Sequence, residues 1–148
     1  MARIRRSVHP TDFSSASGPA FKKALEIAKD NNASLAIIHV LPALPIVGDA
    51  YIAPAAYDEM LNAQRAQAER SMERLVKRAR AAGVRATGTV LDSGAVADQI
   101  ARFAKRQRAD LIVMGTHGHG IFARALLGSV AERVINRAPC PVMTVKGR

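Results

Sequence analysis

A glycine pattern in the last third of the chain is the part of the sequence best suited to chemistry. An apolar run ends at Met114 and leads into Gly115, Gly118 follows after two residues, and nine residues separate Gly118 from Gly128 and Ser129. Glycine lacks a Cβ atom and tolerates positive φ, so consecutive backbone N–H groups can converge on one point and an anion can approach them closely. The pattern predicts a backbone cradle for phosphate groups.

A helix start follows the glycine turn. Ser129 and Glu132 have the spacing of a capping box, in which the two side chains bond to backbone N–H groups of the first helical turn. The remaining N–H groups of that turn and the positive end of the helix dipole attract anions. We therefore expect a polyphosphate to be held between the glycine turn and this helix.

Two better-known phosphate motifs do not fit the same segment. Gly115 and Gly120 have the glycine spacing of a Walker A loop, but Ile121 and Phe122 stand where that loop needs lysine and Ser or Thr. Residues 118–123 match the loose dinucleotide pattern, yet they lie too late in the sequence for the βαβ unit and the later acidic residue that such a site needs. The turn is interpreted as a phosphate site of another type.

Strand and helix patterns alternate along the chain. We expect a first short strand that ends at 8–10, further strands at 34–41, 84–91, 111–114 and 141–145, and helices at 16–30, 57–82, 95–107 and at the capping box of Ser129. This alternation predicts an α/β fold with a doubly wound parallel sheet and helices on both faces. Ligands bind such sheets at the carboxyl ends of the strands, where the strand order reverses. That rule selects residues 10–14 and 115–128, so a second argument points to the glycine turn.

Composition is consistent with this fold. The 148 residues are 49% hydrophobic and predict one domain over 1–148. The sequence has no apolar run of about 20 residues that would span a membrane and no export signal, so a cytoplasmic location is expected. Cys140, the single cysteine, is expected to be a small apolar filler.

These residues resemble a known family, the universal stress proteins. The nucleotide-binding branch of that family is marked by Gly-x2-Gly-x9-Gly-(Ser/Thr), which Gly115, Gly118, Gly128 and Ser129 match without a gap. The resemblance covers residues 4–146 and implies a five-stranded, adenine nucleotide alpha hydrolase-like sheet. Segments that flank the motif or lie near the N-terminus also resemble the family: 109–118, 126–134, 138–142 and 10–14.

The resemblance implies a role for each part of the site. The loop after the first strand would contact the nucleoside, with Asp12 as a polar contact to adenine or ribose, and the backbone at Val40 would read the adenine edge. The glycine turn would wrap the ribose and phosphates, and the helix start would present N–H groups to the phosphate tail. The implied ligand is ATP or another adenine nucleotide, with Mg²⁺ held mainly by phosphates and water. The implied site comprises Pro10, Thr11, Asp12, Val40, Met114, Gly115, Thr116, His117, Gly118, His119, Gly120, Ile121, Gly128, Ser129, Val130 and Ala131.

Polar residues near the site need separate interpretation. Ser7 and His9 stand in the first strand, where family members usually have an apolar run, and we expect them to form local hydrogen bonds. His117 and His119 could form a metal site with His9 or His39, but no third ligand is fixed by the pattern, and imidazoles in an anion loop equally suit phosphates. We assign no metal site.

The pattern favours binding over catalysis. Phosphoryl transfer needs a base or positioned water and cations that stabilise the transition state. Asp12 and Arg124 are the nearest candidates, and neither spacing is diagnostic. We assign no catalytic residue and predict a regulatory or sensor module of the stress response that binds ATP, with at most the slow hydrolysis or autophosphorylation that the resemblance allows.

Two alternatives stay open. The net charge of +10 could attract nucleic acid, although few aromatic residues are available for base stacking and a solvated basic face explains the charge equally well. The resemblance implies a homodimer through the strand at 141–146, which lies at the predicted sheet edge, and a nucleotide-independent dimeric interaction module is the other alternative. The charge gathers in two helices at Arg65, Arg70, Arg74, Lys77, Arg78, Arg80, Arg102, Lys105, Arg106 and Arg108.

Overall fold

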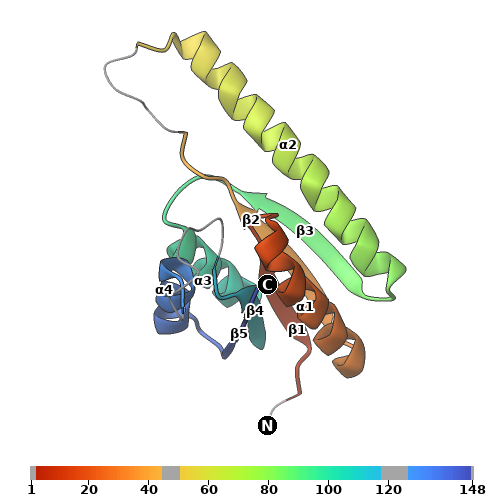
Figure 1. Cartoon of the computed structure of the whole chain (residues 1–148). Helices are drawn as coiled ribbons and strands as arrows, with labels where there is room; N and C mark the ends of the chain where they lie inside the picture. The colour runs from red at the N-terminus through yellow and green to blue at the C-terminus, as the bar shows by residue number, and fades with distance from the viewer. Residues whose placement is uncertain (1–2, 45–50, 118–126, 148) are drawn as a thin grey trace.

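Five parallel strands form one sheet in the order β3-β2-β1-β4-β5 (Figure 1). The computed structural model describes residues 3–44, 51–117 and 127–147. Its strands are β1 (Arg6–Pro10), β2 (Ser34–Val40), β3 (Arg85–Leu91), β4 (Leu111–Gly115) and β5 (Val142–Val145). A short 3₁₀ turn (Ser15–Ser17) precedes α1 (Gly18–Asn31), and the other helices are α2 (Pro54–Ala81), α3 (Val96–Arg106) and α4 (Ser129–Arg137).

The sheet is covered on both faces, which confirms the predicted doubly wound α/β class. Phe21 of α1 and Met72 of α2 belong to one buried cluster, together with Ile37 of the sheet. Ile100 of α3 belongs to a second cluster on the other face, together with Ile38. Neighbouring residues of a strand point to opposite faces. The near-continuous apolar strands in the sequence therefore reflect burial on both sides.

The ends of α1 and α2 lie next to residues that commonly terminate or begin helices. Asn32 caps α1 in the left-handed conformation, with φ 51°, and Gly83 follows α2 with φ 86°. Both helices end within one residue of the ends expected from the sequence, 30 and 82. The start of α2 was wrong by three residues, because the helix begins at Pro54 rather than near Tyr57. Proline suits the first helical turn, where its missing N–H has no helical partner.

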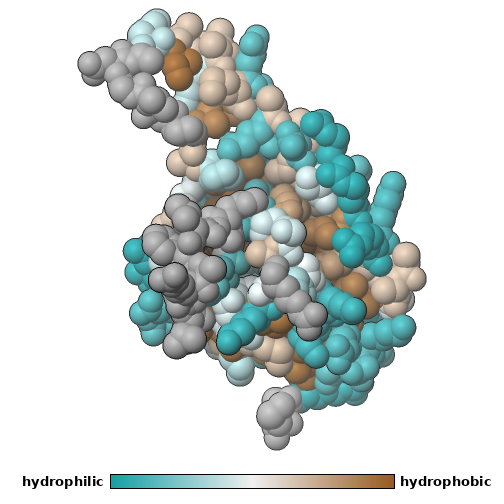
Figure 2. All heavy atoms as spheres, viewed as in Figure 1, coloured by the Kyte–Doolittle hydropathy of each residue, from teal (hydrophilic) through white to brown (hydrophobic). Residues whose placement is uncertain are grey.

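The two halves of α2 have different surroundings. Its C-terminal half packs along β2 and β3, whereas its first turns project past the carboxyl ends of the strands (Figure 1). Figure 2 shows mainly hydrophilic residues along the packed half and a mixed surface at the projecting end. Tyr57 and Met60, in the projecting half, are exposed. None of the described helices is long and apolar enough to cross a membrane.

The central strand β1 contains two buried polar side chains, those of Ser7 and His9. The Ser7 hydroxyl donates to the carbonyl oxygen of Ser34 at 3.0 Å, and His9 Nδ1 donates to the carbonyl oxygen of Val113 at 2.8 Å. Both side chains therefore form hydrogen bonds, but with the neighbouring strands β2 and β4 rather than locally as expected. His9 is fully buried, and desolvation lowers its pKa from 6.5 to about 4, against the opposing effects of the Val113 hydrogen bond and the Asp12 charge. His9 is therefore neutral in the folded protein at pH 7.

Stability is expected to fall in mild acid because of His9. The folded pKa lies below the unfolded one, so the stabilisation is complete above pH 6.5 and is lost as the pH falls from 6.5 to about 4. The loss amounts to about 3 kcal/mol of unfolding free energy. Urea unfolding at pH 7, 5.5 and 4.5 measures it. His9→Gln keeps a donor for Val113 and cannot titrate; an unchanged pH dependence in this variant would contradict the assignment.

The close approach of α2 to β3 gives a second prediction. A Cβ atom built on Gly88 would lie 2.5 Å from Met72 Cγ and 2.7 Å from Val76 Cγ2. Gly88→Ala should push α2 away from the sheet and lower the unfolding free energy by about 1 to 3 kcal/mol. Gly18→Ala is the matched control, because a Cβ atom there meets nothing within 4 Å. Equal denaturation midpoints for the two variants would show that the packing at Gly88 is loose.

Candidate functional site

A pocket of about 1110 Å³ lies at the carboxyl ends of β1, β2 and β4. The loop after β1, the middle of α2 and the start of α4 form its walls. The strand order reverses between β1 and β4, so this is the position at which doubly wound sheets bind ligands. The described parts of the two segments selected from the sequence, 10–14 and 115–128, therefore contribute to one pocket.

Twelve of the predicted site residues are described, and all twelve line this pocket. Those after β1 and β2 are Pro10, Thr11, Asp12 and Val40, and those around the glycine motif are Met114, Gly115, Thr116, His117, Gly128, Ser129, Val130 and Ala131. The other four, Gly118, His119, Gly120 and Ile121, lie outside the described residues. Arg124, the predicted loop cation, lies outside them as well.

Gly128 is required for packing within the loop itself. Its N–H donates to the carbonyl oxygen of Thr116 at 2.7 Å, and a Cβ atom built on it would lie 2.7 Å from the same oxygen. Its φ of −74° is ordinary. At Gly115 a Cβ atom would meet nothing closer than 3.4 Å. Position 128 therefore needs glycine because a side chain there would collide with the Thr116 carbonyl oxygen. The absence of a side chain lets the start of α4 lie against Thr116.

The start of α4 corrects one expectation. Gly128 is the N-cap residue, Ser129 is the first helical residue, and no side chain caps the helix. The predicted capping box of Ser129 and Glu132 is wrong. Because Gly128 has the extended conformation of an N-cap, its carbonyl oxygen accepts the N–H of Glu132 at 3.0 Å without help from a side chain. The N–H groups of the first turn are thus left for another partner, at the wall of the pocket.

Asp12 organises the loop after β1. Its Oδ1 accepts hydrogen bonds from the Ser14 N–H at 2.9 Å, the Ser14 hydroxyl at 2.6 Å and the Ser17 hydroxyl at 2.6 Å. Phe13 is held between them with φ 64°, a conformation that non-glycine residues rarely adopt. The carboxylate therefore shapes the pocket wall from within the protein. Contact of Asp12 with a nucleoside stays a prediction.

Two histidines line the pocket. His39 Nδ1 donates to the carbonyl oxygen of Thr11 at 2.8 Å, and its ring lies 4.4 Å from that of Phe13, centroid to centroid. His117 Nδ1 lies 3.0 Å from the Thr116 hydroxyl, and its buried Nε2 has no hydrogen-bond partner among the described residues. Within the same residues no three His, Cys, Asp or Glu side chains are grouped as metal ligands.

The wall that α2 contributes was missed from the sequence. Gln64, Gln67, Ala68 and Ser71 line the pocket from the middle of this helix. These residues belong to no recognised motif. The helical periodicity of the sequence does not indicate which strand ends the helix crosses. The amphipathic pattern around Ala68 and Met72, both buried, was the one available signal.

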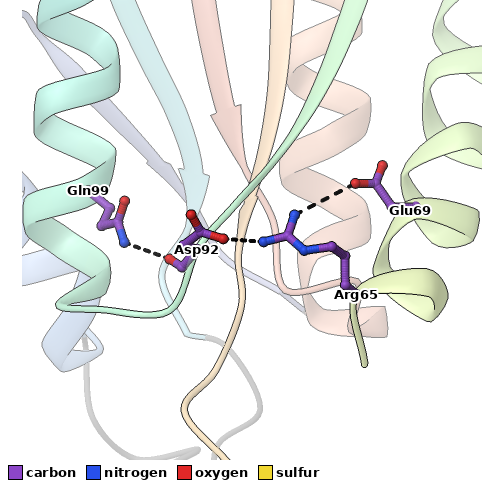
Figure 3. Close-up of polar contacts among 4 residues, drawn as sticks. All are labelled: Arg65, Glu69, Asp92 and Gln99. Atoms are coloured by element: carbon purple, nitrogen blue, oxygen red, sulfur yellow. Dashed lines mark hydrogen bonds and ion pairs between the residues drawn. The ribbon is translucent and has the colours of Figure 1, made fainter. Parts of the chain in front are cut away.

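Exposed polar side chains connect this part of α2 with its neighbours. Arg65 forms an ion pair with Asp92, which follows β3, and lies 3.9 Å from Glu69 Oε1 one turn along the helix (Figure 3). Gln99 of α3 donates to the Asp92 backbone carbonyl at 2.6 Å (Figure 3). The network therefore links α2 to the β3–α3 turn beside the pocket.

Comparison with known proteins agrees with the motif and the fold. The model of the universal stress protein family matches residues 3–146. A universal stress protein of Methanocaldococcus jannaschii is 39% identical over 142 residues, which cover 96% of this chain and 82% of the relative.

Solved structures of the family share the architecture. The universal stress protein UspA from Lactobacillus plantarum superposes with a TM-score of 0.82 at 29% identity, covering 99% of this chain and 100% of the other. A universal stress protein in complex with cAMP has a TM-score of 0.68 at 27% identity, with 99% and 100% coverage. On the match of the family model and the curated relative, this chain belongs to the universal stress protein family.

Proposed function

We propose that this chain is a single-domain, cytoplasmic regulatory module of the stress response that binds ATP, or another adenine nucleotide, in the pocket at the carboxyl ends of β1, β2 and β4. One observation carries the proposal. Segments 10–12 and 114–117 and the start of α4, which are far apart in the sequence, converge on one pocket. The relative that binds cAMP supports the choice of an adenine nucleotide.

The start of α4 is suited to the phosphates. Ser129, Val130 and Ala131 line the pocket, and the N–H groups of a first helical turn point outward along the helix axis. The helix dipole adds a favourable field for negative charge. Backbone N–H groups of this turn would hold the phosphate tail.

The residues fit a magnesium ion that arrives with the nucleotide. No cluster of carboxylates within the described part of the chain could hold it alone. Mg²⁺ commonly keeps several water ligands and binds substrate phosphates, so a site with one nearby hydroxyl, that of Thr116, suffices. The ion would reduce the phosphate charge at the mouth of the pocket.

The site favours binding without efficient turnover. Asp12 is the predicted candidate base, and its Oδ1 already accepts three hydrogen bonds from Ser14 and Ser17. A carboxylate held in this way stabilises a loop conformation. We therefore keep a sensor function, with slow hydrolysis as its upper limit.

The nucleic-acid alternative has less support. Several cations of α2 have partners within the protein. Arg65 pairs with Asp92, Arg78 lies 5.0 Å over the ring of Phe21, and Arg80 donates to the carbonyl oxygen of Ala86. A basic face that also ties helices to the sheet serves the fold. This observation favours the nucleotide pocket as the functional site.

Replacing Ser129 tests the phosphate contact without disturbing the helix. Ser129→Pro removes one N–H at the first helical position, where proline is well tolerated, and the extended backbone of Gly128 suits a residue before proline. We expect the affinity for Mg-ATP to fall about tenfold or more, because a hydrogen bond to a charged group is lost. Isothermal titration calorimetry measures it.

Ser129→Ala is the matched control and should bind within a few-fold of the unmodified protein, because it removes the hydroxyl and keeps the N–H. Equal ATP affinity of the proline and alanine variants would mean that the start of α4 does not hold phosphate. Absence of ATP binding by the unmodified protein would overturn the proposed function.

We also propose a homodimer through the edge strand β5. Pro141 and Val145 turn their carbonyl oxygens toward β4, where they accept the N–H groups of Ile112 and Thr116. By alternation, the N–H of Thr144 faces away from β4, at the free edge of the sheet.

Thr144→Pro should therefore remove an edge donor, keep the β4–β5 ladder and shift the protein toward monomer. Light scattering after gel filtration measures the mass, and Thr144→Val should stay dimeric. A dimer of Thr144→Pro as stable as that of Thr144→Val would place the interface elsewhere.

A further inference from the structure

A second, smaller cavity lies between α1, α2 and the loop after β1. The two helices cover the same face of the sheet (Figure 1), and the cavity between them has a volume of about 480 Å³. Arg74 and Arg78 of α2 line it together with five hydroxyl side chains, and none of its described lining residues is Asp or Glu. A cavity with this lining, here called the arginine cavity, suits an anion.

The two arginines bring their charges to the same side of α2. They are four residues apart, so their side chains are neighbours on the helix surface, where like charges repel each other. Within the part of the chain that the structure describes, neither arginine forms an ion pair. Glu73, next to Arg74 in sequence, does not line the cavity. The described residues therefore gather two positive charges here and supply no counter-charge.

Contacts within the protein hold both guanidinium groups and leave most of their donors free. Arg78 Cζ lies 5.0 Å from the ring centroid of Phe21, a buried residue that also lines the cavity. Stacking of this kind engages the face of the guanidinium group and leaves the N–H groups at its edge available. Arg74 Nη2 donates to the Ser71 hydroxyl at 3.1 Å, which uses one of its five N–H groups. Both arginines are thus positioned before a ligand arrives.

The hydroxyl groups differ in whether they can donate to an anion. Those of Ser14 and Ser17 already donate to Asp12 Oδ1, at 2.6 Å each. The Ser71 hydroxyl accepts from Arg74 and therefore keeps its own proton for a ligand. Ser15 is exposed and lines the cavity at the start of the 3₁₀ turn. Hydroxyl donors are thus available on both walls, from α2 and from the loop after β1.

Size and lining together indicate the class of ligand. The volume lies in the range of small-molecule pockets and exceeds what a free phosphate ion fills. Apolar side chains, those of Phe13, Phe21 and Leu75, form part of the lining and suit a compact apolar group. Two guanidinium groups match a double negative charge, and the three terminal oxygens of a phosphate ester accept hydrogen bonds from several directions. A carboxylate would supply half of that charge.

We propose that the arginine cavity binds a small phosphate monoester, whose dianionic phosphate lies between Arg74 and Arg78 and accepts a hydrogen bond from Ser71. The site is separate from the one proposed for the nucleotide. Neither arginine lines the larger pocket, although the two share a wall at Thr11 and Phe13. The two sites can therefore be tested independently.

Phenyl phosphate is the probe, because it combines a compact ring with a phosphate that is doubly charged at about pH 8. Isothermal titration calorimetry in about 0.15 M salt, which screens long-range attraction, should show saturable binding with a Kd below about 1 mM. Arg74→Gln and Arg78→Gln should each weaken binding about tenfold, because each removes a charge-assisted hydrogen bond. Benzyl alcohol, a neutral ring compound, should not bind at the same concentrations.

Arg70→Gln is the matched control. Arg70 is exposed one turn before Arg74 and does not line the cavity, so this variant loses the same charge and should keep the affinity for phenyl phosphate. Thermal unfolding without ligand shows whether each variant is folded. Arg78 packs on Phe21, so Arg74→Gln, whose contact with Ser71 is exposed, carries the test should Arg78→Gln unfold.

The start of α4 is the other place where a phosphate could bind, and the Ser129→Pro variant separates the two. Loss of Arg74 should weaken binding as much in this background as in the unmodified protein. Binding that Ser129→Pro abolishes and Arg74→Gln leaves intact would overturn the arginine cavity and support the phosphate site of the larger pocket. An equal loss in Arg70→Gln, or no saturable binding by the unmodified protein, would also overturn the cavity as a site. Failure to bind ATP would leave this proposal standing.

Discussion

The parallel pairing of β1 with β4 is the constraint on which the pocket depends. Ser7 and Val8 align with Leu111 and Ile112 at the point where the strand order reverses, so the chain leaves the two strands toward opposite faces of the sheet. The opening between these exits is the pocket. Burying Ser7 and His9 in the central strand is acceptable because backbone carbonyl oxygens of β2 and β4 accept their hydrogen bonds.

Backbone geometry makes one side of the pocket, and side chains make the other. On the β4 side, the contact of Gly128 with Thr116 fixes the helix start, and the available donors are backbone N–H groups. On the β2 side, the amide of Gln64 and the rings of Phe13 and His39 line the wall. Backbone donors recognise negative charge whatever group carries it, whereas side chains determine the shape and polarity of the wall that a ligand meets.

The sequence allowed the sheet, the helices and the loops of the pocket to be predicted, because each rests on a local pattern. Apolar strands, stops at Asn32 and Gly83, and glycine spacing are all properties of short segments. The wall at Gln64 depends on where α2 crosses the sheet, which is set by contacts such as Met72 with Gly88. The capping box was wrong for a related reason: Ser129 has the residue type of an N-cap, but Gly128, in contact with Thr116, occupies that position and Ser129 is the first helical residue.

The two sides of the pocket also differ in how firmly they are held. The other side is built on β4 and α4, whose residues Ile112 and Val134 are fully buried in one core cluster. The part of α2 that carries Gln64 lies before the buried contacts at Ala68 and Met72, and its link to Asp92 is an exposed ion pair, with side chains 39% and 87% accessible. Exposed pairs of this kind contribute about 0 to 1 kcal/mol. Few contacts therefore fix the wall that α2 contributes, and a ligand held against this wall would add to them.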